Sequence, residues 1–125
     1  MTPAEIQVER VDFLSVPVTD VERAKQFYGE TLGLEHETDW GEIGAEFRAG
    51  QVTVAVFAPE KIGREFTSSS TAIALRVPDV AAAREALQAK GIEFHGETID
   101  SGVCHMAIFH DPDGNPLMLH RRHDV

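Results

Sequence analysis

The sequence predicts an α+β domain built from two copies of one strand–helix–strands unit. The segment 13–20, Phe-Leu-Ser-Val-Pro-Val-Thr-Asp, has the same pattern as the segment 72–79, Ala-Ile-Ala-Leu-Arg-Val-Pro-Asp. Further along, residues 47–54 align with residues 109–118 if a two-residue insertion is allowed. Solenoid repeats normally need three or more copies to bury a continuous core, so two copies favour a pair of modules related by a pseudo-twofold axis.

The length of 125 residues fits one domain, which we take as residues 1–125. Within it we place the two modules at about 8–60 and 71–123. A chain of this size buries enough of its surface for an ordinary apolar core.

The first module begins with a strand and a helix. In residues 13–18 every second residue is leucine or valine. This alternation is the period of a strand. Thr19 followed by Glu22 fits a capping box, so we expect a helix that begins there. This helix should run to about Thr31, because Gly33 suits the left-handed residue that follows a helix.

Two strands complete the first module, and a connection leads to the second. Residues 46–48 and 52–57 are predicted to be strands joined by a turn that contains Gly50. Residues 61–70 carry no periodic pattern and are expected to be a mobile link between the modules.

The second module repeats this order. Residues 73–77 alternate as a strand, and Asp79 should cap a second helix that ends at Lys90-Gly91. The remaining strands are expected at 92–94, 103–109 and 117–121. The turn 111–115, Asp-Pro-Asp-Gly-Asn, joins the last two.

Composition excludes several classes of partner. Twenty-one acidic and eleven basic residues give a formal net charge of -10, which repels phosphate backbones and anionic membrane surfaces. We therefore expect no nucleic acid and no membrane as partners. The single cysteine, Cys104, excludes an intrachain disulfide, and the N-terminal segment lacks a signal-peptide pattern. These features predict a cytoplasmic protein.

Two helices can cover only one face of each sheet, so the other face is expected to line a cavity. Alternation assigns to this face residues that are mainly apolar, with a few polar groups, as a small-molecule site requires. The residues placed there are Phe13, Ser15, Pro17, Glu46, Arg48, Val52, Val54, Val56, Ala72, Ala74, Arg76, Cys104, Met106, Ile108, Met118 and His120.

From this face we select a ligand-binding set, with Glu46, Arg76 and His120 as polar anchors. Its apolar walls are Phe13, Val54, Val56, Ala72, Met106 and Met118. His105 lies on the opposite face from His120 by alternation, so these two histidines are not expected to converge on a metal.

Three stretches resemble the vicinal oxygen chelate superfamily, which includes glyoxalase I, extradiol dioxygenases and bleomycin-resistance proteins. They are residues 18–34, with Phe-Tyr in the helix and a following Leu-Gly-Leu, residues 73–80, and residues 109–115. The resemblance implies paired βαβββ modules forming a half-open β-barrel, with the helices on the outer face, and usually a homodimer.

The resemblance also implies where a divalent metal would bind in the enzymes of the superfamily. The aligned positions here are Phe13, Val54, Ala72 and Met118. None of these side chains suits a hard divalent cation, so no metal cofactor is expected. This favours a protein that sequesters a drug or a metabolite, as the bleomycin-resistance proteins do. The alternative is a lyase or dioxygenase whose active site has moved, for example to Glu46 and His120, with or without a divalent metal.

Overall fold

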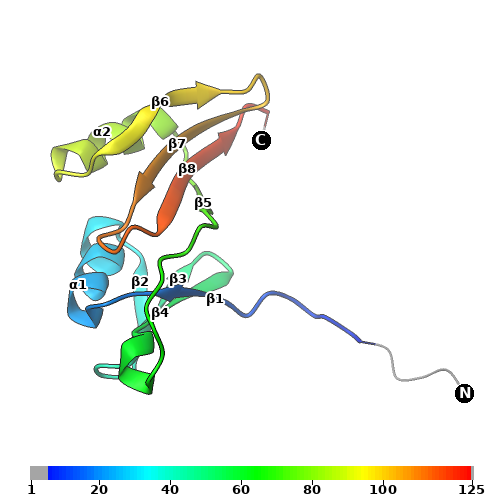
Figure 1. The fold of residues 1–125 in the computed structure, drawn as a ribbon. Coiled ribbons are helices and arrows are strands. Elements are labelled where there is room, and N and C mark those ends of the chain that lie inside the picture. Colours follow the sequence, from blue (N-terminus) through cyan, green and yellow to red (C-terminus); the bar gives the residue numbers. More distant parts are fainter. Residues whose placement is uncertain (1–5, 125) are drawn as a thin grey trace, which may run out of the picture.

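The computed structural model describes residues 6–124. Figure 1 shows the two modules, each with its own sheet and its own helix. The first module contains β1 (Phe13–Pro17), α1 (Val21–Lys25), the π-helix η1 (Gln26–Thr31), β2 (Glu35–Asp39), β3 (Gly44–Ala49), β4 (Val52–Phe57) and the 3-10 helix η2 (Pro59–Ile62). The second module contains β5 (Ile73–Arg76), α2 (Val80–Ala89), β6 (Phe94–Asp100), β7 (Cys104–His110) and β8 (Pro116–Arg122).

The two sheets have the same topology, which confirms the predicted repetition. The strand orders are β1-β4-β3-β2 and β5-β8-β7-β6. In each sheet the first strand pairs with the last one in parallel, across a helical crossover, and the other pairs are antiparallel. Neither sheet closes on itself within residues 6–124, which agrees with the expected half-open, curved sheets of an α+β fold.

The predicted helix ends are mostly correct, with one correction. The first helical segment runs through α1 and η1 to Thr31, and Gly33 has a φ of 78°. The side chain of Asp79 caps α2 by accepting a hydrogen bond from the amide of Ala82. At the start of α1, however, Asp20 is the cap and Thr19 is not. Thr19 instead donates its hydroxyl hydrogen bond to Asp113 in the second module.

Two strands differ from the prediction. β2 was not predicted, because Glu35–Asp39 is entirely polar and exposed and therefore has no apolar alternation. The expected short strand at 92–94 is in fact β6, Phe94–Asp100, whose exposed polar residues also hide its period. Both are edge strands, held by backbone pairing with one neighbour.

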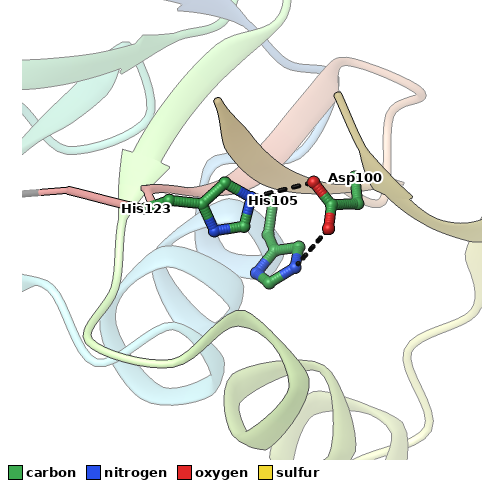
Figure 2. A group of neighbouring side chains, drawn as sticks. All are labelled: Asp100, His105 and His123. Carbon is green, nitrogen blue, oxygen red and sulfur yellow. Dashed lines mark hydrogen bonds and ion pairs between the residues drawn. The ribbon is translucent and has the colours of Figure 1, made fainter. Parts of the chain in front are cut away.

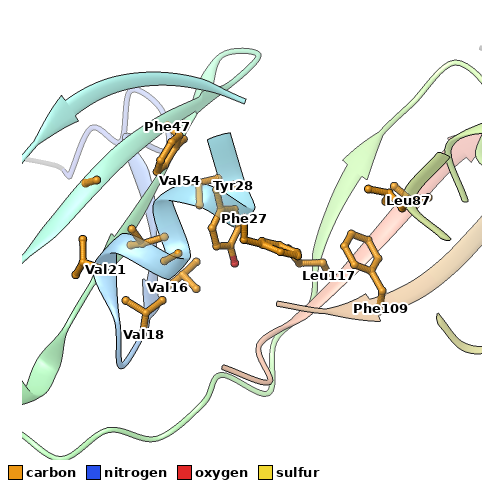
Figure 3. Packing of buried hydrophobic residues seen from close by; sticks show 14 of the residues in the cluster. Val16, Val18, Val21, Phe27, Tyr28, Phe47, Val54, Leu87, Phe109 and Leu117 are labelled. Atoms are coloured by element: carbon orange, nitrogen blue, oxygen red, sulfur yellow. The ribbon is translucent and has the colours of Figure 1, made fainter. Parts of the chain in front are cut away.

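The apolar core lies between the helices and the sheets and also joins the two modules. Phe27 and Tyr28 are 5% and 1% exposed and belong to the core. The ring of Phe27 meets Tyr28 edge-on at 5.1 Å and lies 6.4 Å from the ring of Phe109 in the second module. Figure 3 shows Phe27 extending from the first module towards Phe109 and Leu117. The helical segment of the first module therefore stabilises both halves.

Buried polar groups reinforce this junction. Asp111 is 5% exposed, and its carboxylate accepts a hydrogen bond of 2.7 Å from the hydroxyl of Tyr28. It also accepts bonds from the backbone and side-chain amides of Asn115, and Asn115 in turn donates to the carbonyl of Pro17. Burial and the adjacent Asp111 raise the pKa of Tyr28, so its hydroxyl stays protonated and donates. The predicted turn 111–115 thus connects the modules.

None of the helices among residues 6–124 has both the length and the apolar character that crossing a membrane requires.

Candidate functional site

The face of the second sheet that points away from α2 carries four of the predicted ligand-binding residues, Arg76, Met106, Met118 and His120. Residues that are paired across strands share a face of the sheet. Arg76 pairs with His120, which pairs with Met106 on its other side. In the next row Ala74 pairs with Met118. Met106, Met118 and His120 are half-buried and Arg76 is exposed, so this open face is accessible and largely apolar. That these residues bind a ligand stays a prediction.

The open face of the first sheet includes Phe13 and Glu46. Ser15 pairs with Ala55, and Ala55 pairs with Glu46 on its other side. Phe13 belongs to the neighbouring row and is 53% exposed. The placement of these residues on the open face is confirmed. Ala72 lies one residue before β5 and is also exposed.

The placement of Val54 and Val56 on this face is wrong. Val54 pairs with Phe47 and Val56 with Ala45, on the face that α1 covers. The two valines are 2% and 0% exposed and belong to the core. β4, Val-Thr-Val-Ala-Val-Phe, is almost entirely apolar and has no clear alternation. An error of one residue in its register therefore exchanges its two faces.

The same error affected the alignment of the metal positions. Phe47 pairs with Val54 in the first module, whereas the equivalent Phe109 pairs with Leu117. The insertion in the second hairpin is therefore one residue long and not two. Met118 is equivalent to Ala55, and Val54 is not an aligned ligand position.

After this correction the aligned positions are Phe13, Ala55, Ala72 and Met118. Three of these side chains have no donor atom, and the fourth is a thioether, which suits soft metals. The residues present do not fit the divalent metal that the fold family implies.

Three of the predicted polar residues lie on the open faces. Glu46, Arg76 and His120 make no side-chain hydrogen bond or ion pair with any residue from 6 to 124. Arg48, on the same face as Glu46, is by contrast paired with Glu37 of β2. The pairing of Glu46 with Arg76, which would have satisfied both groups internally, is not present. These three groups are therefore available to a ligand or to solvent.

A cavity of about 630 Å³ lies between the modules, mainly on the side of the second sheet that α2 covers. It is formed by the end of η1, the β3–β4 turn, β5 and α2, and Arg76 contributes to its wall. Its volume is in the usual range for small-molecule sites. Met106, Met118 and His120 do not line it. Arg76 thus lies at the border between the open face of the second sheet and this cavity.

A second group of candidate side chains was not predicted from the sequence. Figure 2 shows Asp100, His105 and His123 gathered at the end of the second sheet. Nε2 of His123 lies 2.8 Å from one oxygen of Asp100, and Nε2 of His105 lies 3.3 Å from the other. The hydrogen bond from His123, together with one from the Gly102 amide, lowers the pKa of Asp100 to about 2.

Comparison with known proteins identifies a family model that matches most of this chain. The family model described as "Glyoxalase/Bleomycin resistance protein/Dioxygenase superfamily" matches residues 10–119. Protein YetH from Bacillus subtilis (strain 168) is 25% identical over 120 residues, which covers 90% of this chain and 98% of YetH.

Two solved structures illustrate the range of similar proteins. TnmS3, an antibiotic binding protein from Streptomyces sp. CB03234, has a TM-score of 0.78 and 27% identity, with 94% of this chain and 99% of TnmS3 covered. Lactoylglutathione lyase from Agrobacterium tumefaciens has a TM-score of 0.78 and 17% identity, with 91% and 94% covered. The second likeness concerns the fold alone.

Proposed function

Because the chain belongs to the glyoxalase/bleomycin resistance protein/dioxygenase superfamily, we propose that it binds a small organic molecule on its open sheet faces without altering it. The observation that carries this proposal is the character of the second open face. Half-buried Met106 and Met118 lie beside Arg76 and His120, which lack partners among residues 6–124. Apolar walls with a few unpaired polar groups are what a small-molecule site needs.

The residues at the aligned metal positions support binding over catalysis. Phe13, Ala55 and Ala72 offer no ligand atom, and the sulfur of Met118 is a poor ligand for Mg²⁺, Mn²⁺ or Ni²⁺. The chemistry of the enzymes in the family depends on a metal at these positions, and the fold alone does not supply that chemistry to a chain without the metal ligands. Sequestration of a drug or a metabolite is the function that remains.

The charge of the protein indicates the kind of ligand. A net charge of -10 attracts cations and repels phosphorylated molecules over the whole surface. The likeness to an antibiotic binding protein, at 27% identity, supports a ligand of antibiotic type. We therefore favour a cationic or neutral aromatic molecule, with Glu46 and His120 as its polar contacts.

A thermal-shift screen tests this proposal. It contains bleomycin-like glycopeptides, flat aromatic antibiotics, fosfomycin and glutathione conjugates. A cationic or neutral aromatic compound should raise the melting temperature by several degrees at a hundredfold excess over its Kd. His120→Ala and Met118→Ala should weaken its binding about tenfold each, because each removes a contact on the open face.

The matched control is a substitution that fills the cavity between the modules. Ala86 lines the cavity between the modules, and Ala86→Met should leave binding on the open face unchanged. Loss of binding in Ala86→Met with full binding in Met118→Ala would place the ligand in that cavity and contradict the proposal. Stabilisation by fosfomycin and glutathione conjugates alone, abolished by Arg76→Ala, would contradict it as well.

The alternative function is a lyase or dioxygenase that uses the unpaired Glu46 and His120, with or without a relocated divalent metal. Turnover of methylglyoxal–glutathione adducts or catechols, measured with and without added divalent metal, distinguishes it from sequestration. Activity that Glu46→Gln and His120→Ala both abolish would replace the binding proposal.

We also expect a homodimer with two equivalent cavities. Both sheets have open edges, and apolar side chains at one of them, such as Ile99, are strongly exposed. Sedimentation at micromolar concentration should give about twice the chain mass of 13.7 kDa, and ligand titration should give one site per chain. A sedimentation mass near 13.7 kDa would contradict this prediction.

A further inference from the structure

The cluster of Asp100, His105 and His123 brings three metal-ligating groups from three segments to one point. Asp100 ends β6, His105 is the second residue of β7, and His123 follows β8. One ligand atom from each residue lies within 4.8 Å of the others. This is the one group of three or more such side chains found among residues 6–124.

Both imidazoles point the same nitrogen at the carboxylate. Nε2 of His123 and Nε2 of His105 approach the two different oxygens of Asp100. The two rings meet edge-on, with centroids 4.4 Å apart. The nitrogens therefore converge on a single carboxylate, as they would around a shared ion.

The backbone holds these groups in place. The amide of Gly102 donates a 2.9 Å hydrogen bond to Asp100 and fixes its carboxylate within the tight β6–β7 turn. The amide of His123 donates to the carbonyl of Val103 in the same turn, which holds the end of the chain against the hairpin. Hydrogen bonds that orient the ligands in this way are typical of metal sites.

We propose that Asp100, His105 and His123 bind one Zn²⁺ ion per chain, with water in the fourth coordination position. Two imidazoles and one carboxylate are a ligand set that zinc uses, at distances of roughly 2.0–2.2 Å. Such distances need the ligand atoms to be closer than they are now, and the half-exposed side chains have room to move by that amount.

The cluster is separate from the candidate ligand site, and its ligand types select the metal. His105 pairs with Arg121, whereas Met106 pairs with His120, so His105 lies on the opposite face from the candidate ligand site. The zinc site is therefore separate from the positions at which the family resemblance implies a metal. Ca²⁺ and Mg²⁺ prefer oxygen ligands, of which this cluster offers only one carboxylate. Coordination by imidazole favours zinc.

Isothermal titration calorimetry of the tag-free, chelator-treated protein with Zn²⁺ tests the proposal. One ion per chain should bind with a Kd of about 10 µM or tighter, and Mg²⁺ should give no heat. The double variant His105→Ala/His123→Ala should bind at least a hundredfold more weakly, and Asp100→Asn at least tenfold. Co²⁺ in place of Zn²⁺ should give the visible absorption of a four-coordinate site.

The second histidine pair of the same sheet supplies the control. The rings of His95 and His110 lie 6.5 Å apart. Neither of these histidines forms an ion pair with a carboxylate of residues 6–124. The variant His95→Ala/His110→Ala should bind Zn²⁺ as the natural protein does. Circular dichroism checks that each variant is folded, and His105→Gln/His123→Gln replaces the alanine variant if that one is not.

Two results would overturn the proposal. One is Zn²⁺ binding that persists in a folded His105/His123 double variant. The other is no saturable binding by the natural protein at 100 µM Zn²⁺, which would leave the cluster as two imidazoles paired with a carboxylate.

Discussion

Asp111→Ala should lower the free energy of unfolding by about 3–5 kcal/mol at pH 7, one of the two largest losses that we expect from a single substitution. The carboxylate of Asp111 accepts bonds from the hydroxyl of Tyr28, from both amides of Asn115 and from the amide of Asp113. Removing it leaves buried donors without an acceptor. Loss of a buried charged acceptor costs much more than loss of an exposed ion pair.

Urea unfolding measures this loss, and the m-value, which is the slope of the unfolding free energy against urea concentration, should be the same for both proteins. Tyr28→Phe removes one of the hydrogen bonds and should cost about 1–2 kcal/mol. Asp12→Ala is the control, because both members of the Arg10–Asp12 pair are 74% exposed, and it should change stability by less than about 0.5 kcal/mol. An Asp111→Ala protein that unfolds within about 1 kcal/mol of the natural one would show that the network does not hold the modules together.

Gly44→Ala should destabilise the protein by about 3 kcal/mol, because there is no space for a methyl group at this position. Gly44 is buried at the start of β3, opposite Phe57. A Cβ atom there would collide with the backbone carbonyl of Val56 and would lie 3.2 Å from the Cα of Phe57. Backbone atoms in a paired strand cannot move aside without loss of the β3–β4 ladder.

Gly29→Ala is the matched comparison. Its Cβ would lie 3.1 Å from the ring of Phe47, which is a side chain and can shift. We expect a loss of about 1 kcal/mol or less, since alanine also has the higher helix propensity. Thermal unfolding of both variants should therefore show a clearly lower midpoint for Gly44→Ala. Equal midpoints would contradict the close approach of β3 and β4.

Much of the fold was predictable because its signals are local. The alternation of residues 13–18 and 73–77 and the cap at Asp79 depend on neighbours in the chain, and the first cap was misplaced by only one residue, at Thr19 instead of Asp20. The repeat of these signals then fixed the two-module organisation. β2 and β6 gave no such signal, because edge strands with polar side chains are stabilised by backbone pairing that local composition does not record.

The candidate site was predictable only where a strand alternates clearly. β8 reads Pro-Leu-Met-Leu-His-Arg-Arg, so Met118 and His120 were assigned to the correct face. β4 is apolar on both faces, and Val54 and Val56 were therefore assigned to the wrong one. Only the register with β3 decides this, because a shift of one residue exchanges the two faces of a strand.

The sequence by itself therefore determined the α+β class, the paired modules and the acidic charge, since residue type and local period are enough for each. The register of β4 was needed to place one of the aligned metal positions at Ala55 instead of Val54. The tertiary structure alone decided which residues meet over long separations in the chain. Asp111 reaches Tyr28 across the module junction, and Asp100 meets His123, which follows β8. Such contacts depend on strand register and on the packing of one module against the other, and no local pattern encodes them.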